Sequence, residues 1–140
     1  MWPAVTRSAA ARELAMDLGA VWSGGEGSKP PAALDSALVF APAGEIVPAA
    51  LSHLDQGGTL VIAGIHLSDV PSLNYAEHLF GERDVRSVTA ATRQDGEELL
   101  RLAARLGVTA RVTAYPLEDA DRALRDLSHG RIAGTAVLIP

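Results

Sequence analysis

The apolar positions of this chain follow two alternating patterns, and together they predict strands and helices in turn. Short apolar runs occur at 37–40, 59–63, 85–90, 112–115 and 136–139. Runs of this length suit strands that are buried on both faces of a parallel sheet. Between them, apolar residues recur at helical spacing in four segments, which begin near Ser8, Val47, Thr92 and Leu117. The chain is therefore expected to be an α/β protein built on a parallel sheet.

Polar and small residues predict where these elements begin and end. Ser8 is a good N-cap for the first helix, and Thr92 with Asp95 resembles a capping box for the third. Glycines follow the first, third and last helical segments, where a left-handed residue ends a helix. The stretch Ser23–Pro31 is rich in glycine and proline and is expected to be a solvated loop.

Composition and charge narrow the possible functions. The 140 residues carry a formal net charge of −5, which argues against nucleic acid as a partner. No apolar run approaches the length of a membrane span, so no membrane partner is expected. The N-terminus lacks the pattern of a secretory signal, and we expect a cytoplasmic location. The sequence contains no cysteine, which excludes disulfides and thiolate metal ligands.

Three segments of the sequence, taken in order, carry a family likeness. They are Thr6–Ala20, Gln56–Ile65, and Tyr115–Leu124 with Gly130, Arg131 and Gly134 after it. This ordered set resembles the cofactor domain of the zinc-type alcohol dehydrogenases, in the medium-chain dehydrogenase/reductase superfamily. The resemblance implies a partial, Rossmann-like NAD(P)-binding domain over residues 1–108. It also implies that residues 109–140 form a segment that packs on the catalytic domain in the family.

Open α/β sheets bind ligands at the carboxyl ends of their strands, and small residues gather at those ends here. The candidate cofactor-binding residues are Thr6, Arg7, Ser8, Ala41, Pro42, Gly64, Ile65, Val88 and Ala90. By resemblance, Gly64 and Ile65 would line the nicotinamide. The backbone at Val88 and Ala90 would bond its carboxamide. The alternative interpretation is that these are ordinary small residues at strand ends.

Arg7 bears on which cofactor is expected. An acidic side chain at the end of the second strand favours NAD, whereas an arginine nearby accommodates the 2′-phosphate of NADP. The positions from Thr6 to Ser8 offer Arg7 and no acid, and Arg12 follows one turn into the helix. We therefore expect NADP rather than NAD. The alternative is a solvated arginine beside a helix N-cap.

The sequence also departs from the family. The phosphate-binding first strand and its glycine-rich turn should lie just before Val5, and four residues precede it. The predicted fold is therefore an incomplete Rossmann-like sheet with weak nucleotide binding. No catalytic residue and no metal ligand is assigned, because the family's cysteine ligands are missing. His66 follows a strand of the predicted site but is not expected to bind zinc. Arg131 is expected to face solvent at a helix end.

Three functional hypotheses remain at this stage. The chain is the cofactor portion of an alcohol dehydrogenase and is inactive alone, or it is a non-catalytic dimeric remnant, or it is an interaction module. The missing central strand should leave sheet edges and apolar surface uncovered. A homodimer is expected through an edge strand at Val70–Tyr75, with Leu73 and Tyr75 on one face.

Overall fold

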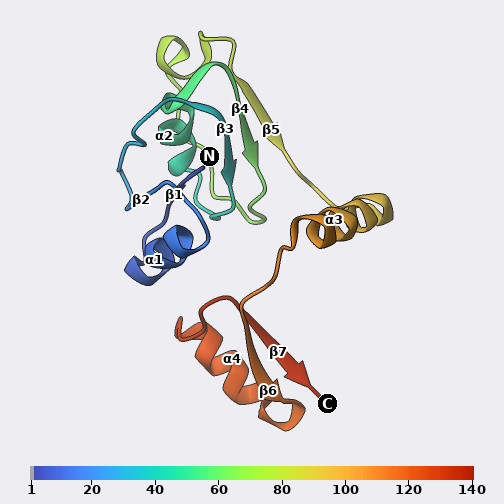
Figure 1. Ribbon diagram of the computed structural model, residues 1–140. Helices are drawn as coiled ribbons and strands as arrows, with labels where there is room; N and C mark the ends of the chain where they lie inside the picture. Colours follow the sequence, from blue (N-terminus) through green and yellow to red (C-terminus); the bar gives the residue numbers. More distant parts are fainter. Residues whose placement is uncertain (1) are drawn as a thin grey trace. The chain divides into compact units, whose positions relative to one another are not determined.

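The computed structural model describes residues 2–140, which separate into two compact units on either side of the Ala90–Ala91 bond. Both units are built of parallel strands and helices (Figure 1). The α/β fold class predicted from the apolar pattern is therefore confirmed. No helix among residues 2–140 is long and apolar enough to cross a membrane.

The first unit opens with a strand–helix–strand segment. β1 (Pro3–Val5) and β2 (Trp22–Gly24) pair in parallel and are joined by α1 (Ala9–Asp17). The Ser8 hydroxyl caps α1 as predicted, since it accepts a hydrogen bond from the N–H of Ala11 at 3.3 Å. The loop expected from Ser23 is wrong at its start, because residues 23 and 24 belong to β2. The glycine that suggested a loop is needed there, since a Cβ on it would overlap the Trp22 ring.

A second sheet of the first unit contains three parallel strands in the order β3-β4-β5. These are β3 (Leu34–Val39), β4 (Leu54–Ile62) and β5 (Asp84–Ser87). The helix α2 (Ile46–Ser52) connects the first two of them. β4 begins five residues before the predicted strand, and β5 ends three residues before the predicted end at residue 90.

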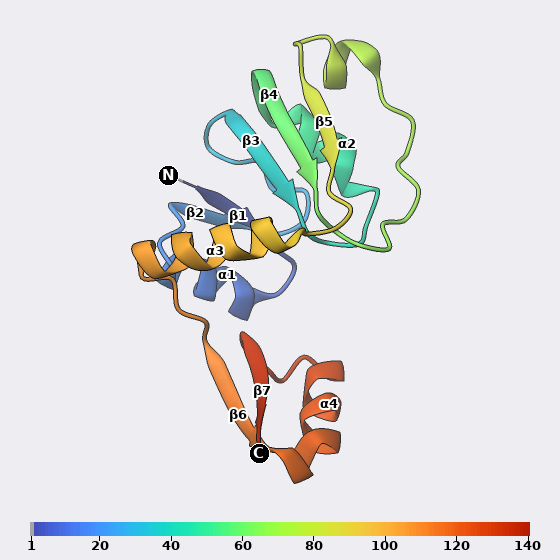
Figure 2. The ribbon, with the colours of Figure 1, turned by 90° about the vertical axis from the view of Figure 1, so that its right-hand side faces the viewer.

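The hydrophobic core lies between α2 and one face of this second sheet (Figure 2). Its buried members are Val39, Val47, Leu51, Leu54 and Leu60. Leu51 and Leu60 are fully buried. Side chains alternate across a strand, and Leu38, next to the core residue Val39, is 63% exposed. The opposite face at Leu38 is therefore left open.

The sheet of the first unit is interrupted at the position predicted from the sequence. Among the described residues, β1 pairs only with β2, and β3 pairs only with β4. In the order 3-2-1-4-5-6 of a doubly wound fold, the first strand lies between these two pairs. The incomplete Rossmann-like sheet is therefore confirmed, and each of β1 and β3 presents an unpaired edge.

The second unit contains α3 and a small parallel pair of strands. Its elements are α3 (Arg93–Leu106), β6 (Val112–Pro116), η2 (Leu117–Asp119), α4 (Ala120–Ser128) and β7 (Thr135–Ile139), with β6 paired to β7. The capping box of Thr92 and Asp95 is present with both bonds. Tyr115 and Ala123 are buried, but Leu124 and Leu127 on α4 remain more than half exposed. The expected uncovered apolar surface is therefore present.

The structural boundary at Ala90–Ala91 differs in place from the sequence-based division at 108. The structural boundary follows compactness and puts α3 with the second unit. The division at 108 separates a cofactor-binding part from a part that packs on another domain, and it stays a prediction.

The segment proposed as an edge strand has a different local structure in the single chain. Residues 70–74 belong to no strand, and Tyr75 opens the π-helical turn η1 (Tyr75–Leu79). Leu73 packs against the core of the second sheet, whereas Tyr75 is 66% exposed. Because these two side chains have different surroundings, the expected strand alternation at Leu73 and Tyr75 is wrong for the single chain.

Candidate functional site

The carboxyl end of β1 is fixed by hydrogen bonds that converge on its backbone. The N–H of Thr6 donates to the carbonyl of Gly24 at 3.0 Å, which extends the pairing with β2. The Arg12 guanidinium donates to the carbonyls of Thr6 and Arg7 at 2.9 and 2.8 Å. Arg12 therefore holds the turn between β1 and α1 in place, and part of its donor capacity is used by the backbone.

Arg7 and Ser8 complete this turn in different ways. The Ser8 hydroxyl is occupied as the cap of α1. The Arg7 side chain is exposed and makes no hydrogen bond or ion pair with any of residues 2–140. Arg7 is thus the cationic group at this strand end that remains available to an anionic ligand.

The carboxyl ends of β3 and β4 approach each other closely at Gly64. The N–H groups of Ala63 and Gly64 both donate to the carbonyl of Val39, at 2.8 and 3.0 Å. A Cβ on Gly64 would lie 2.9 Å from the carbonyl oxygen of Phe40 and 3.0 Å from that of Ala41. Only glycine fits this approach without a shift of the backbone. The neighbouring side chains of Ala41, Pro42 and Ile65 are exposed.

The end of β5 lies beside the end of β4. The N–H of Val88 donates to the carbonyl of Ile62 at 3.0 Å, one residue beyond β5. Val88 is 57% exposed, and Ala90 is exposed as the last residue of the first unit. The backbone of Ala90 makes no ladder bond, so the predicted strand through residue 90 is wrong at its end.

The predicted site residues therefore fall into two groups within the first unit. Ala41, Pro42, Gly64, Ile65 and Val88 gather at one end of the β3-β4-β5 sheet, with Ala90 two residues further on. Thr6, Arg7 and Ser8 lie at the carboxyl end of the separate β1-β2 sheet. No hydrogen bond among the described residues joins the two groups. Their shared role in binding a cofactor stays a prediction.

A further contact at this end was missed by the sequence reasoning. The N–H of Gly44 donates to the Ser68 hydroxyl at 2.8 Å, and that hydroxyl lies 3.3 Å from a carboxylate oxygen of Glu45. A Cβ on Gly44 would overlap the backbone oxygens of Ser68 and Asp69. These bonds tie together the loops that follow β3 and β4. The lone glycine before α2 was the only sequence signal for this contact.

The histidines serve mainly as local structural groups. His53 and His129 are the C-cap residues of α2 and α4. His78 is 8% exposed, and its Nδ1 accepts a bond from the N–H of Asn74 at 2.9 Å. His66 is exposed and has a positive φ of 62° in the turn after β4.

Among the described residues, the possible metal-binding side chains and Arg131 lie outside any common site. Within residues 2–140, no three histidine, aspartate or glutamate side chains lie together in a group able to hold a metal ion. Arg131 is exposed at the end of α4 and pairs with Asp126 at 3.2 Å. This agrees with its expected position at a helix end.

Comparison with known proteins gives the family. No family model matches the chain. The probable alcohol dehydrogenase AdhA of Mycobacterium tuberculosis is 53% identical over 135 residues, which are 96% of this chain and 39% of that protein. This chain is related to the alcohol dehydrogenases and corresponds to a C-terminal part of their sequence. An alcohol dehydrogenase of Moraxella sp. is 35% identical over 102 residues, which are 73% of this chain and 30% of the relative.

Solved structures support the same fold. The alcohol dehydrogenase of the archaeon Aeropyrum pernix aligns with a TM-score of 0.76 and 22% identity. The alignment covers 99% of this chain and 42% of the archaeal one. The chain thus spans about two fifths of the length of such alcohol dehydrogenases. The resemblance inferred from residues 6–20, 56–65 and 115–134 is confirmed at the level of the family.

Proposed function

We propose that this chain is the cofactor-domain portion of an NAD(P)-dependent, zinc-type alcohol dehydrogenase and that it is inactive alone. The identity of 53% with an alcohol dehydrogenase over nearly the whole chain carries this proposal. In such an enzyme the nicotinamide accepts or donates the hydride that interconverts alcohol and aldehyde. The role of this chain is to hold that cofactor.

The described residues offer contacts to two parts of the cofactor, the nicotinamide ring and the ribose phosphate. Exposed small residues and Gly64 leave the backbone accessible at the ends of β3 and β4, where a flat nicotinamide ring can approach. At the end of β1, Arg7 supplies a free guanidinium for a ribose phosphate. Residues 2–140 contain no glycine-rich strand–turn–helix for the pyrophosphate, so binding by this chain should be weak.

Arg7 favours NADP over NAD. A guanidinium pairs well with a phosphate, and no acidic side chain at residues 6–8 is present to bond the 2′-hydroxyl of NAD. NADPH and NADH are titrated separately against the chain, with nicotinamide fluorescence as the signal. We expect NADPH to bind more tightly. Arg7→Ala should weaken NADPH binding about tenfold, because one charged hydrogen bond is lost.

Arg93→Ala is the matched control for this titration. Arg93 is an exposed arginine at the start of α3, and its replacement changes the net charge equally. NADPH affinity should be unchanged in this variant. Equal affinities for NADH and NADPH, or an Arg7→Ala variant that binds NADPH like the parent chain, would show that the NADP assignment is wrong.

Zinc chemistry does not fit the residues of this chain. The described residues offer no cluster of metal ligands, and the sequence has no cysteine. We expect metal analysis of the purified chain to find no stoichiometric zinc, and we expect no alcohol to be oxidised with either nucleotide. One tightly bound zinc per chain, or turnover of an alcohol, would contradict this part of the proposal.

A second candidate function is a dimeric remnant or interaction module without catalysis. The unpaired edges of β1 and β3 favour it, because such edges accept strands from other chains. We propose a homodimer that uses residues 70–75. The exposed Tyr75 ring stacks edge-on against Phe80 at 5.9 Å, and Phe80 is 68% exposed. Tyr75, backed by Phe80 five residues further on, is the apolar contact that the segment offers to a second copy.

A further inference from the structure

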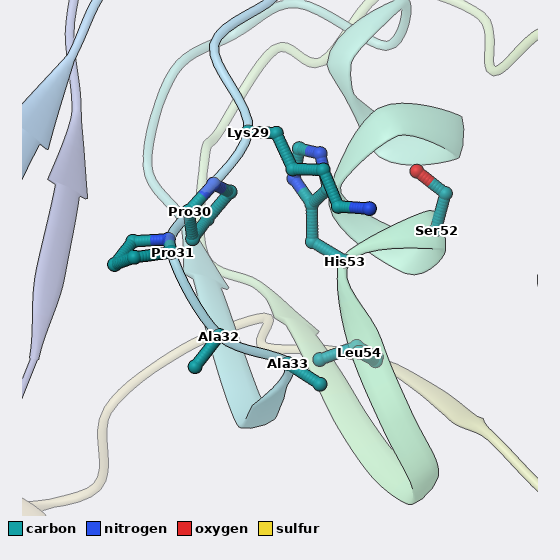
Figure 3. A pocket seen from close by; sticks show the side chains of 8 residues that line it. All are labelled: Lys29, Pro30, Pro31, Ala32, Ala33, Ser52, His53 and Leu54. Atoms are coloured by element: carbon teal, nitrogen blue, oxygen red, sulfur yellow. The ribbon is translucent and has the colours of Figure 1, made fainter.

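A cavity of about 240 Å³ lies at the amino ends of β3 and β4, at the opposite end of the sheet from the predicted cofactor residues (Figure 3). One wall is the loop that leads into β3, and the other is the end of α2 with the first residue of β4. The residues that line it are Lys29, Pro30, Pro31, Ala32, Ala33, Ser52, His53 and Leu54. A water occupies about 30 Å³ in the liquid, so the cavity has room for a small solute.

Two basic side chains line this cavity, and no acidic one does. Lys29 reaches from the loop toward the imidazole of His53 (Figure 3). Lys29 makes no ion pair or hydrogen bond with any of residues 2–140. Burial, and then the charge of Lys29, lower the pKa of His53 below its usual 6.5. The two groups therefore act on each other, and no described side chain neutralises them.

The acidic groups near Lys29 and His53 in the sequence lie outside the cavity, and Glu26, three residues before Lys29, is exposed and does not line it. Asp35 on β3 and Asp55 on β4 are exposed and do not line it. Asp55 accepts a bond from the N–H of Gln56 at 2.8 Å. The helix α2 carries no charged residue. Lys29 is therefore the charged group that influences His53 from the elements packed around it.

The backbone around the cavity is fixed before any ligand binds. Pro30 is buried, and the two consecutive prolines restrict the loop after Lys29. The N–H of Leu34 donates to the carbonyl of His53 at 3.0 Å, which ties the loop to the end of α2. This bond also satisfies a carbonyl that would otherwise repel an anion at a helix C-terminus.

We propose that this cavity binds a small oxyanion, a phosphate or carboxylate group, between the Lys29 ammonium and the His53 imidazole. The oxyanion forms an ion pair with the ammonium of Lys29 and accepts a hydrogen bond from the imidazole N–H of His53. The apolar wall of Pro30, Pro31 and Leu54 can hold the organic part of such a ligand. This site is separate from the proposed cofactor site and does not depend on it.

The test follows the His53 imidazole by NMR over pH in inorganic phosphate, in acetate and in chloride at equal ionic strength. Phosphate or acetate should raise the pKa of His53 relative to chloride, because a bound anion favours the charged imidazole. The exposed His66 and His129 serve as references in the same spectra and should not respond. Comparison of the two salts tells whether the site takes phosphates, carboxylates or both.

Lys29→Ala and Lys29→Arg separate binding from general screening. Lys29→Ala should raise the pKa of His53 in chloride, since the repulsion is gone, and weaken phosphate binding about tenfold. Lys29→Arg keeps the positive charge, so the lowered pKa of His53 and the binding of phosphate should both be retained. Equal responses of His53, His66 and His129 would mean an adventitious ion only. That result, no response of His53, or binding unaffected by Lys29→Ala would overturn the proposal.

Discussion

Single residues at strand ends and helix ends set the local geometry of this chain. Arg12 clamps the turn after β1 through two carbonyls, and Gly64 permits the close approach of the loops after β3 and β4. His53 joins α2 to the loop before β3. Each of these roles gives a substitution with a defined outcome.

Gly64→Ala tests the close approach at the predicted nicotinamide end. The added Cβ would lie 2.9 Å from the carbonyl oxygen of Phe40, so the backbone must shift. We expect a loss of about 1–3 kcal/mol in the free energy of unfolding, measured by urea denaturation. Gly96→Ala is the control, because nothing lies within 4 Å of a Cβ there. It should stabilise helix α3 slightly. Equal effects of the two substitutions would contradict the predicted close approach.

His53 makes stability depend on pH in a stated direction. Burial and Lys29 lower the pKa of His53 in the folded chain below 6.5. The unfolded chain therefore binds more protons between these two values, and stability falls as the pH drops through that window. Melting temperatures are measured by thermal unfolding at about pH 7.5 and about pH 5.5. The decrease in melting temperature between these pH values should be smaller for His53→Gln than for the parent chain. The exposed His66→Gln should behave like the parent, and a similar loss in all three proteins would refute the assignment.

At the scale of elements, the packing of α2 on the β3-β4-β5 sheet provides the main core. Leu51→Ala removes a fully buried side chain from α2 and should cost about 2–5 kcal/mol of unfolding free energy. Leu124→Ala removes the same atoms from α4, where the side chain is 64% exposed, and should cost about 0.5 kcal/mol or less. Chemical denaturation measures both. A comparable cost at the two positions would contradict the placement of the core.

The apolar pattern predicted the elements well where local signals were strong. Ser8 and Thr92 predicted two helix starts, and the buried strand around Leu60 was found from its apolar run. β2 was missed because it is three residues long and ends in a glycine, which local rules assign to loops. The π-helical turn η1 was missed because it is held by local bonds at Asn74: its side chain accepts from the N–H of Glu77, and its own N–H donates to the buried His78.

The candidate site could be predicted less completely than the fold. Positions at strand ends follow from the order of apolar runs, so Gly64 and Val88 were expected at the ends of two strands, and the N–H of Val88 does bond the last carbonyl of β4. The clamp by Arg12 and the bond between Gly44 and Ser68 join residues across turns and loops. Such bonds leave no periodic pattern in a sequence. The gap between the β1-β2 and β3-β4-β5 sheets also separates the predicted residues into two groups.

At the scale of the whole molecule, unpaired sheet edges and uncovered apolar side chains favour association with a second copy. We expect light scattering to give the mass of a dimer at micromolar concentration. Tyr75→Arg should reduce it toward the monomer, because Tyr75 is exposed and does not belong to the core. Leu99→Arg on α3 is a control with similar exposure and should leave the dimer intact. A monomeric parent chain, or a dimer that only Leu99→Arg disrupts, would rule out the proposed segment.

In the function proposed for it, this chain holds a nicotinamide cofactor at the carboxyl ends of its strands. The most direct measurement is an amide NMR map of the chain during titration with NADPH. We predict that the perturbed amides cluster at residues 6–8, 41, 64–65, 88 and 90. Absence of any perturbation at millimolar NADPH, or perturbations that avoid these strand ends, would contradict the claim.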